Sequence, residues 1–331
     1  MSDLLILGGR QRNAGTNLNE WNHYDKALAL RIFDDGSAAK SVIEYETPPQ
    51  YCPDEFPSIV FKAGTISNGL LYACTQTEVL IYNADTFELM SHITHPCFND
   101  IHHVTPTPKG TMLVAVTGLD MVVEITHNGD IVNEWDVLGE SLWTRFSRDT
   151  DYRKVQTTKP HKSHPNFLFI LDGEYWVLRH AQRDAISLKN PDKKINIQVQ
   201  RPHDGLEYED RIYFTTVDGH IVAADKTTSE IVQIVNLNEF SDSDRPLGWC
   251  RGIHIIDKDT IIIGFSRLRP TAIMESVQWA KRKLKNALNI ENDDSLPTRL
   301  CCYDLAKNIV LWEIDLENSG MNAIFSIHEL S

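Results

Sequence analysis

The sequence predicts an all-β protein, folded as a six-bladed β-propeller, and three observations carry this prediction. Short apolar segments alternate with Asn-Gly, Asp-Gly and Lys-Gly pairs along most of the chain, and such a pair between two apolar segments is a strong hairpin signal. One unit, which consists of a histidine, an apolar strand, a tight turn and a second strand, recurs along the chain, as is typical of propeller blades. The two ends of the chain each supply part of one further unit.

The clearest unit begins at His164. An apolar strand at 167–171 follows, then the Asp172-Gly173 turn, then strands at 175–178 and 185–188. Three similar units begin at His102-His103, at His203 and at His254, and a fifth has Lys62 where the others have histidine. The spacing between units is irregular, which we interpret as loop insertions.

The sixth unit is predicted to contain both ends of the chain. Residues 321–327 resemble an inner strand that has no hairpin partner after it, and residues 4–7 resemble a second strand that has no first strand before it. Paired with each other, and extended by strands at 28–33 and 41–45, they would close the ring and remove its open sheet edges.

We expect one domain over residues 1–331, because no linker or low-complexity segment interrupts the pattern. An insertion at about 270–298 contains apolar residues at helical spacing over 272–289 and basic residues on the remaining face. This amphipathic helix is expected to cap one end of the propeller. A lid, a dimer contact and a contact with an anionic membrane surface are the alternatives.

Composition excludes several classes of function. The net charge of −14 argues against a nucleic-acid partner. The first residues have neither a basic segment nor an apolar run longer than four residues, so we expect a cytoplasmic protein without a signal peptide or an integral membrane segment. The six cysteines lack C-x-x-C spacing, which favours reduced, buried thiols. The basic connection at 142–162 is either an attractor for an anionic ligand or a solvated surface loop.

The histidines are the candidate functional residues. The first strand of each blade lines the central channel, so His103 (or its neighbour His102), His164, His203 and His254 are predicted to meet on the axis. Three or four imidazoles with open coordination positions suit a divalent transition metal such as Fe, Zn, Cu, Mn or Ni. His161 and His180 are out of phase, and we expect them either in loops or behind the residues that form the site.

Basic residues are predicted to surround this histidine group. Arg179, Arg267 and Lys62 would bind a small anionic or polar substrate at the rim, and Arg10 occupies a place in the closing blade equivalent to that of Arg267.

One segment also resembles a known family. The run His164-x-Asn166, followed by Asp172-Gly173 and Arg179, is similar to the H-x-N…DG…R segment of the PAPS-independent arylsulfotransferases. The likeness covers roughly residues 98–225 and includes the pair His203-Asp204. It implies a six-bladed propeller in which His203 carries the sulfuryl group as the catalytic nucleophile. His164, Asn166, Arg179 and His103 would then bind the sulfate oxygens.

Three functions follow from these observations. The first is a metal-dependent enzyme, of lyase, hydrolase or oxygenase type, with His103, His164, His203 and His254 as ligands. The second is metal-free, sulfotransferase-like group transfer through a histidine. The third is a non-catalytic scaffold that binds a partner through its rims. The sequence makes no prediction of the oligomeric state.

Overall fold

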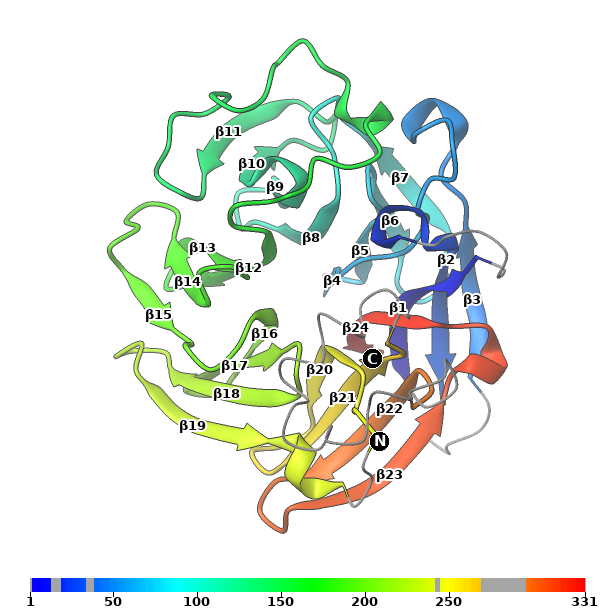
Figure 1. The fold of residues 1–331 in the computed structure, drawn as a ribbon, viewed down its shortest axis with the longest axis vertical. Coiled ribbons are helices and arrows are strands. Elements are labelled where there is room, and N and C mark those ends of the chain that lie inside the picture. Colours follow the sequence, from blue (N-terminus) through cyan, green and yellow to red (C-terminus); the bar gives the residue numbers. More distant parts are fainter. Residues whose placement is uncertain (1, 13–18, 34–38, 242–244, 269–295, 331) are drawn as a thin grey trace, which may run out of the picture.

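The fold is a ring of six four-stranded antiparallel sheets around a central axis (Figure 1). A computed structural model describes residues 2–12, 19–33, 39–241, 245–268 and 296–330. The six-bladed propeller predicted from the repeated units is therefore confirmed.

Each blade runs from an inner strand at the axis to an outer strand at the rim. The closing blade contains β24 (Ala323–Glu329), β1 (Leu4–Gln11), β2 (Tyr24–Ile32) and β3 (Lys40–Tyr45). The next two blades contain β4 (Thr65–Ser67), β5 (Leu70–Cys74), β6 (Val79–Asn83) and β7 (Leu89–Ile93), and then β8 (Ile101–Pro106), β9 (Met112–Val116), β10 (Met121–Ile125) and β11 (Ile131–Asp136).

The remaining three blades follow in chain order. They contain β12 (Pro165–Leu171), β13 (Glu174–Arg179), β14 (Asp184–Ser187) and β15 (Lys194–Asn196); β16 (Pro202–Tyr208), β17 (Arg211–Thr216), β18 (His220–Asp225) and β19 (Ile231–Asn236); and β20 (Trp249–Ile255), β21 (Thr260–Ser266), β22 (Arg299–Asp304) and β23 (Ile309–Asp315).

Helices are short in the described part of the chain. They are the 3-10 turns η1 (Glu20–Asn22), η2 (Pro49–Tyr51), η3 (Thr117–Leu119), η4 (Tyr152–Lys154), η5 (Leu237–Phe240) and η8 (Glu317–Ser319). None of the helices in the described ranges is both long and apolar enough to cross a membrane. The amphipathic helix predicted at 272–289 lies outside the described residues.

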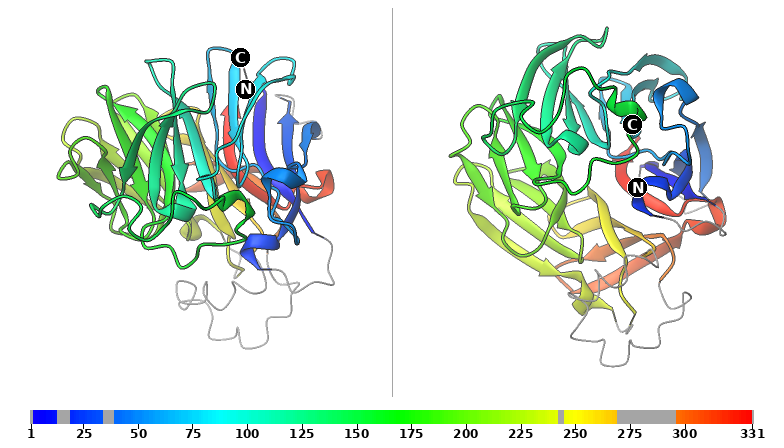
Figure 2. Two further views of the ribbon diagram at one scale, coloured as in Figure 1. Left: turned by 90° about the horizontal axis from the view of Figure 1, so that it is seen from above. Right: turned by 45° about the horizontal axis from the view of Figure 1, so that its top comes forward.

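The ring is closed by strands from both ends of the chain, as predicted. β1 pairs antiparallel with β24 from Leu4 opposite Glu329 to Gly9 opposite Ala323, and β1 also pairs with β2 (Figure 2). Leu4, Leu5, Ile6 and Leu7 are all buried, because this strand packs against neighbours on both of its faces. This pairing gives the inner strand β24 a hydrogen-bonded neighbour within its own blade, as the inner strands of the other five blades also have.

The hairpin turns have the backbone that their sequences predict. Asp172 and Gly173, between β12 and β13, have φ values of 51° and 75°, and Asn68 and Gly69 have φ values of 52° and 73°. Positive φ at both central residues is what a type I′ turn requires. The turn residues therefore fix the register in which apolar side chains reach the space between blades.

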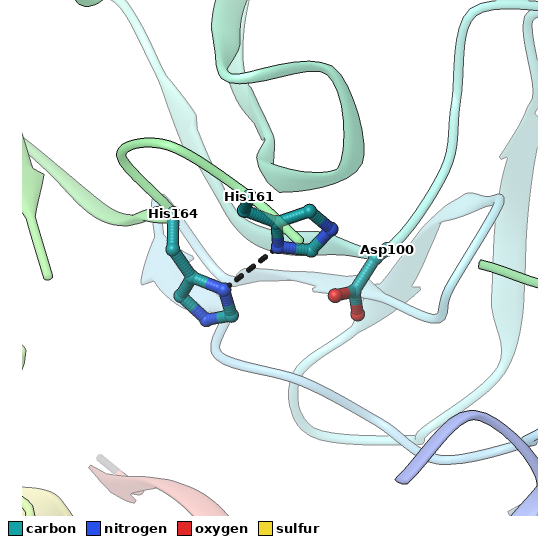
Figure 3. A group of neighbouring side chains, drawn as sticks. All are labelled: Asp100, His161 and His164. Carbon is teal, nitrogen blue, oxygen red and sulfur yellow. Dashed lines mark hydrogen bonds between the residues drawn. The ribbon is translucent and has the colours of Figure 1, made fainter. Parts of the chain in front are cut away.

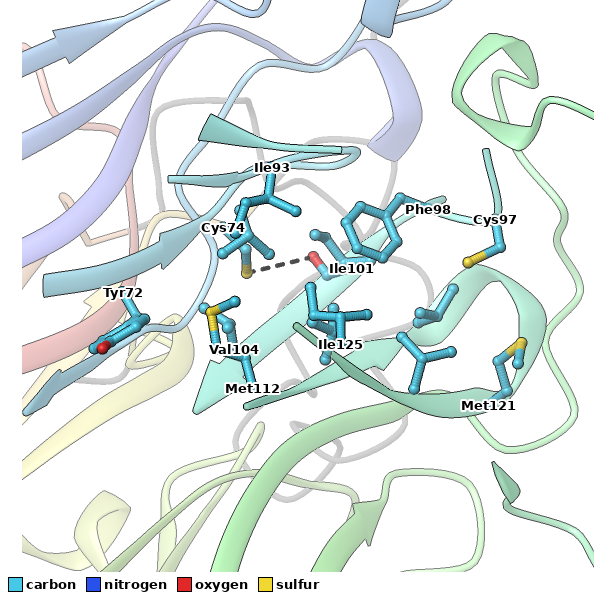
Figure 4. Close-up of a cluster of buried hydrophobic side chains, with 14 of the residues drawn as sticks. Tyr72, Cys74, Ile93, Cys97, Phe98, Ile101, Val104, Met112, Met121 and Ile125 are labelled. Atoms are coloured by element: carbon cyan, nitrogen blue, oxygen red, sulfur yellow. Dashed lines mark hydrogen bonds between the residues drawn. The ribbon is translucent and has the colours of Figure 1, made fainter. Parts of the chain in front are cut away.

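Apolar contacts between adjacent blades form the core. Tyr72, Cys74 and Ile93 of one blade pack against Ile101 and Val104 of the next, as Figure 4 shows. The Cys74 Sγ atom lies 3.9 Å from the Ile101 carbonyl oxygen. All six cysteines are buried and free, as expected. The blades thus form a rigid wall around the axis.

Candidate active site

Four histidines from three blades meet on one part of the axis. The ring centroid of His102 lies 4.7 Å from that of His164 and 6.1 Å from that of His203. The His164 ring lies 4.9 Å from the ring of His180. We call His102, His164, His180 and His203 the axial histidine cluster.

Irregularities in the inner strands place these side chains. The register between inner and second strand shifts between Ile101 and His103, between Pro165 and Phe167, and between Pro202 and Gly205. The inner strand β20 shifts between Arg251 and Ile253. A β-bulge bends its strand and re-aims a side chain, and bulges are common beside active sites. The inner strand β24 also shifts against β1, where Leu7 and Gly8 lie opposite Ser326 and Ile324. Five of the six blades therefore carry an irregularity in their inner strand.

His203 is the residue whose chemistry is most defined. Its ring is 2% exposed, and its Nδ1 atom lies 3.1 Å from Asp204 Oδ1. The Nε2 atom is buried and has no hydrogen-bond partner among the described residues. Asp204 also accepts hydrogen bonds from the Thr215 hydroxyl at 3.0 Å and from the Gly252 backbone N–H at 2.6 Å. With Nδ1 donating to this carboxylate, Nε2 carries a lone pair.

Two cations and an aromatic ring adjoin the cluster. The Lys62 Nζ atom lies 4.8 Å from the centre of the Phe325 ring, and the Arg251 guanidinium carbon lies 4.5 Å from it. The His203 ring centroid lies 6.0 Å from the same ring. Lys62 is 4% exposed, and its Nζ atom lies 3.4 Å from His102 Nε2. Two positively charged side chains therefore contact the Phe325 ring beside His203.

Burial and these charges keep the cluster neutral. Burial lowers the pKa of His203, and Arg251 and Lys62 lower it further against the opposing effect of Asp204. Burial followed by the Lys62 charge lowers the pKa of His102 well below its usual range. Burial likewise lowers the pKa of His180 to about 3. The cluster is therefore a set of neutral imidazoles that adjoins two cations, Lys62 and Arg251, and two carboxylates, Asp100 and Asp204.

A buried carboxylate outside the cluster fixes the loop that carries His164. Asp120 accepts hydrogen bonds from the backbone N–H groups of Lys162, Ser163 and His164 at 2.8, 2.9 and 2.7 Å. It also accepts one from Arg145 at 2.7 Å. Asp120 is therefore a positioning residue for this loop.

The same loop brings His161 and His164 to Asp100 (Figure 3). The two histidine Nδ1 atoms lie 2.9 Å apart. One potential metal-binding atom from each of the three residues lies within 4.8 Å of the others, and these residues are the one group of this kind in the described ranges.

The four histidines predicted as one metal site lie in two places. His164 and His203 belong to the axial cluster, whereas His103 and His254 line a cavity of about 500 Å³ that Asp204 and His328 also line. His103 Nδ1 accepts a hydrogen bond from the Leu168 backbone N–H at 3.0 Å, and its Nε2 lies 3.2 Å from the Gly64 carbonyl oxygen. Both ring nitrogens are thus occupied, so His103 has no lone pair for a metal. Its neighbour His102 faces the cluster.

The basic residues predicted at the rim all pair with a carboxylate, and Lys62 pairs with Asp100 at 3.2 Å. Arg179 forms two hydrogen bonds with Asp184, at 2.8 and 2.6 Å, and a third with the Val137 carbonyl. Arg267 forms two bonds with Glu317, at 2.7 and 2.5 Å. Arg10 pairs with Asp25 at 2.8 Å. Of the four predicted substrate-binding cations, Lys62 is the one that the structure places against the axial cluster.

The basic connection at 142–162 is also largely neutralised. Its ion pairs are Arg145 with Asp120, Arg148 with Glu134, Arg153 with Asp151, Lys154 with Asp54 and Lys162 with Glu140. These pairs favour a structural role for the connection, which holds the loop of His161 and His164 against the blades.

Asn166 lies beside the axial cluster. It is fully buried, and its amide nitrogen donates to the Pro202 carbonyl at 3.0 Å, which also lies 3.1 Å from His180 Nδ1. Its Oδ1 atom is buried and has no partner among the described residues.

Sequence reasoning missed three contributors to this site, which are Asp120, Arg251 and Phe325. Asp120 bonds to backbone groups more than forty positions later, and no local motif signals such a contact. Arg251 and Phe325 sit on inner strands among ordinary apolar residues. A basic or aromatic residue on an inner strand is the signal that would have identified them.

Among the comparisons with known proteins, one solved structure with a TM-score of 0.61 supports the fold. No protein-family model matches the chain, and no curated protein sequence matches it. A protein of unknown function from Bacteroides caccae, solved by crystallography, has 14% sequence identity to this chain. The match has a TM-score of 0.61 and covers 99% of this chain and 98% of that chain. A catalytically inactive virginiamycin B lyase from Staphylococcus aureus, solved with quinupristin, is 16% identical over 71% of this chain and 69% of that chain, with a TM-score of 0.45.

Proposed function

We propose that this protein is an enzyme that acts on a small anionic substrate at the axial histidine cluster, with His203 Nε2 as its base or nucleophile. The observation that carries the proposal is the state of that nitrogen, which is buried, lacks a partner and is opposite an Nδ1 atom held by Asp204. An unsatisfied buried polar atom costs about 1–3 kcal/mol. Such an atom is expected where a ligand completes the hydrogen bond.

The local charge favours an anion. Lys62 and Arg251 both lie against Phe325, and both lower the pKa of His203 and of His102. Asp100 lies 3.2 Å from Lys62 and Asp204 lies 3.1 Å from His203, but a negatively charged ligand would still interact favourably with the two cations. Sulfate esters, phosphate esters and carboxylates are the substrate classes that suit these cations.

The His203–Asp204 pair suits proton abstraction or nucleophilic attack. A carboxylate that accepts from Nδ1 fixes the tautomer and stabilises the positive charge that forms on the ring when Nε2 takes a proton. Thr215 and Gly252 hold the carboxylate in turn. His203 therefore has the geometry of an oriented base.

Sulfuryl transfer is the narrower candidate, because His203 is the residue to which the family resemblance assigns the nucleophile. In this reaction Nε2 would attack the sulfur of a sulfate ester, forming an N–S bond while the ester S–O bond breaks. The leaving oxygen would take a proton from solvent. An acceptor hydroxyl would then attack the sulfur and lose its proton as the N–S bond breaks.

The experiment is a substrate screen with matched variants. Wild type, His203→Gln and the exposed-site control His127→Gln would be incubated with aryl sulfates, phosphate esters and small carboxylates. We expect turnover of one class, a loss of about 100-fold or more in His203→Gln, and unchanged turnover in the control.

Intact-mass analysis after quenching in denaturant at alkaline pH, which preserves an acid-labile N–S or N–P bond on histidine, separates the two mechanisms. A mass increase of one sulfuryl or phosphoryl group in wild type, absent from His203→Gln, supports the nucleophile, whereas turnover without an adduct supports the base. Full activity in His203→Gln would contradict the proposal. If the wild type neither turns over any substrate nor binds an anion, the non-catalytic scaffold is the better account.

A further inference from the structure

We propose that Asp100, His161 and His164 bind one divalent transition-metal ion. Asp100 precedes the inner strand β8, whereas His161 and His164 lie on the loop before β12, so two neighbouring blades supply the ligands (Figure 3). One possible ligand atom from each residue lies within 4.8 Å of the other two. This set differs from the four histidines that the sequence predicted, of which it shares His164 alone.

The spacing of the two imidazoles matches that of adjacent ligands on one ion. Their Nδ1 atoms are 2.9 Å apart. Two nitrogens bound at right angles, each about 2.1 Å from the ion, lie about 3 Å apart. A metal could therefore replace the present contact between the two rings with little movement of either nitrogen.

The donor types indicate the class of ion. Two imidazoles and one carboxylate, with further positions open, are a set typical of non-haem Fe²⁺, and the same donors also suit Co²⁺, Mn²⁺ and Zn²⁺. Asp100 Oδ1 lies 3.2 Å from Lys62 Nζ. A carboxylate has two oxygens, so one can remain with the ammonium group while the other binds the ion.

The surrounding contacts hold the ligands in place. The backbone N–H of His164 donates to Asp120, and the Thr158 hydroxyl lies 3.3 Å from His161 Nε2. The Asp100 carbonyl oxygen lies 2.8 Å from His102 Nδ1. Partners of this kind orient metal ligands, and their loss typically lowers metal affinity by about 10- to 100-fold.

The site is separate from the reactive nitrogen in the proposed function. His203 is not among the three ligands, although the His102 ring lies between His203 and His164, at 6.1 and 4.7 Å from them. The failure of either proposal therefore leaves the other standing.

The test is direct titration of the full chain with Co²⁺, with elemental analysis of metal retained after dialysis. We expect wild type to bind one equivalent and to show the visible absorption of a protein-bound Co²⁺ ion. Asp100→Asn and His161→Gln should each weaken binding by at least tenfold. His203→Gln and His180→Gln should bind as wild type does.

Circular dichroism of every variant separates lost binding from lost folding. His161 lies in a loop, so His161→Gln remains informative if Asp100→Asn does not fold. The proposal is overturned if wild type binds no Co²⁺. It is also overturned if His161→Gln binds normally, or if His203→Gln abolishes binding, since the ion would then be held by other residues.

Discussion

Two adjacent histidines, His102 and His103, show how one position in an inner strand changes the surroundings of a side chain. His102 faces His164 and His203, whereas His103 stacks on Phe167 with ring centroids 4.0 Å apart and connects the backbones of two neighbouring blades. Both are buried. Burial alone therefore does not distinguish the two. The ring nitrogens of His102 contact Lys62 and the Asp100 carbonyl beside the axial cluster, whereas those of His103 contact backbone groups of Leu168 and Gly64.

This difference predicts the stability of two variants. His103→Leu keeps most of the side-chain volume but leaves the Leu168 N–H and the Gly64 carbonyl without their ring partner, and we expect it to lower the free energy of unfolding by about 2–4 kcal/mol. His254→Leu, in the same cavity, should cost less than about 1 kcal/mol. Urea denaturation of both variants measures the difference. Equal losses would contradict the structural role of His103.

Asp120 provides a second test at this scale. In Asp120→Asn, the amide nitrogen would face at least one of the N–H donors that now reach the carboxylate, so we expect a loss of about 2–4 kcal/mol in the free energy of unfolding. The control Asp130→Asn, at an exposed turn, should stay within about 0.5 kcal/mol of wild type. Denaturant unfolding measures both. An unchanged Asp120→Asn would show that the loop of His164 does not depend on this carboxylate.

At the scale of the element, the bulges in the inner strands explain which site residues the sequence could predict. The repeated histidine units predicted that inner strands bring histidines to the axis; His102 and His203 lie on inner strands, whereas His164 precedes β12 and His180 follows β13. Counting alternate residues could not decide between His102 and His103, because the register shifts between Ile101 and His103. A bulge changes which face a side chain takes, and no residue in these segments signals one in advance.

The bulge at Gly252 makes a matched comparison possible. Gly252 and Gly139 have nearly equal φ values of 75° and 76°, but a Cβ atom at Gly252 would lie 3.1 Å from Ile327 Cγ1, whereas the space at Gly139 is open. Replacement by alanine costs about 1–2 kcal/mol at either position because of the left-handed backbone.

Crowding adds to this cost at Gly252 alone. We therefore expect Gly252→Ala to lower the thermal midpoint more than Gly139→Ala does. It should also disturb His203, because the Gly252 N–H holds Asp204. If the two variants have the same thermal midpoint, crowding at Gly252 does not add to the cost of the substitution.

For the whole molecule, the propeller and its closure were predictable and the functional set was predictable only in part. Turn pairs and repeated apolar strands specify each blade locally, and the end strands specify closure by their missing partners. The prediction that Arg179, Arg267 and Arg10 bind a substrate at the rim did not anticipate their ion pairs. The fold brings a carboxylate to each of these arginines. Contacts between distant segments leave no periodic signal in the sequence.

The neutral histidines also make stability depend on pH across the whole fold. Burial lowers the pKa of His103 to about 4 and that of His180 to about 3, and it lowers the pKa of His102 well below its usual range. Below pH about 6.5, these residues bind protons in the unfolded chain but not in the folded protein. Acidification must therefore favour unfolding, by up to about 1.4 kcal/mol per pH unit for each histidine.

We expect the urea midpoint to fall between pH 6.5 and pH 5, a range above the usual pKa values of most carboxylates. The loss due to His103 should level off near pH 4, and that due to His180 near pH 3. Urea titrations at half-unit pH intervals measure this dependence. Constant stability between pH 7 and pH 5 would show that the histidines are not held neutral.

Nitrogen-15 NMR of histidine-labelled protein at pH 7, with His203 assigned from the spectrum of His203→Gln, would show directly which ring nitrogen of His203 carries the proton. We expect a proton on Nδ1, a bare Nε2, and a shift of the Nε2 resonance when sodium phosphate, whose O–H group can donate to Nε2, is added but not when sodium chloride is added at equal ionic strength. A protonated Nε2, or an identical response to both salts, would contradict the assignment of His203 as the base or nucleophile of an anion-binding site.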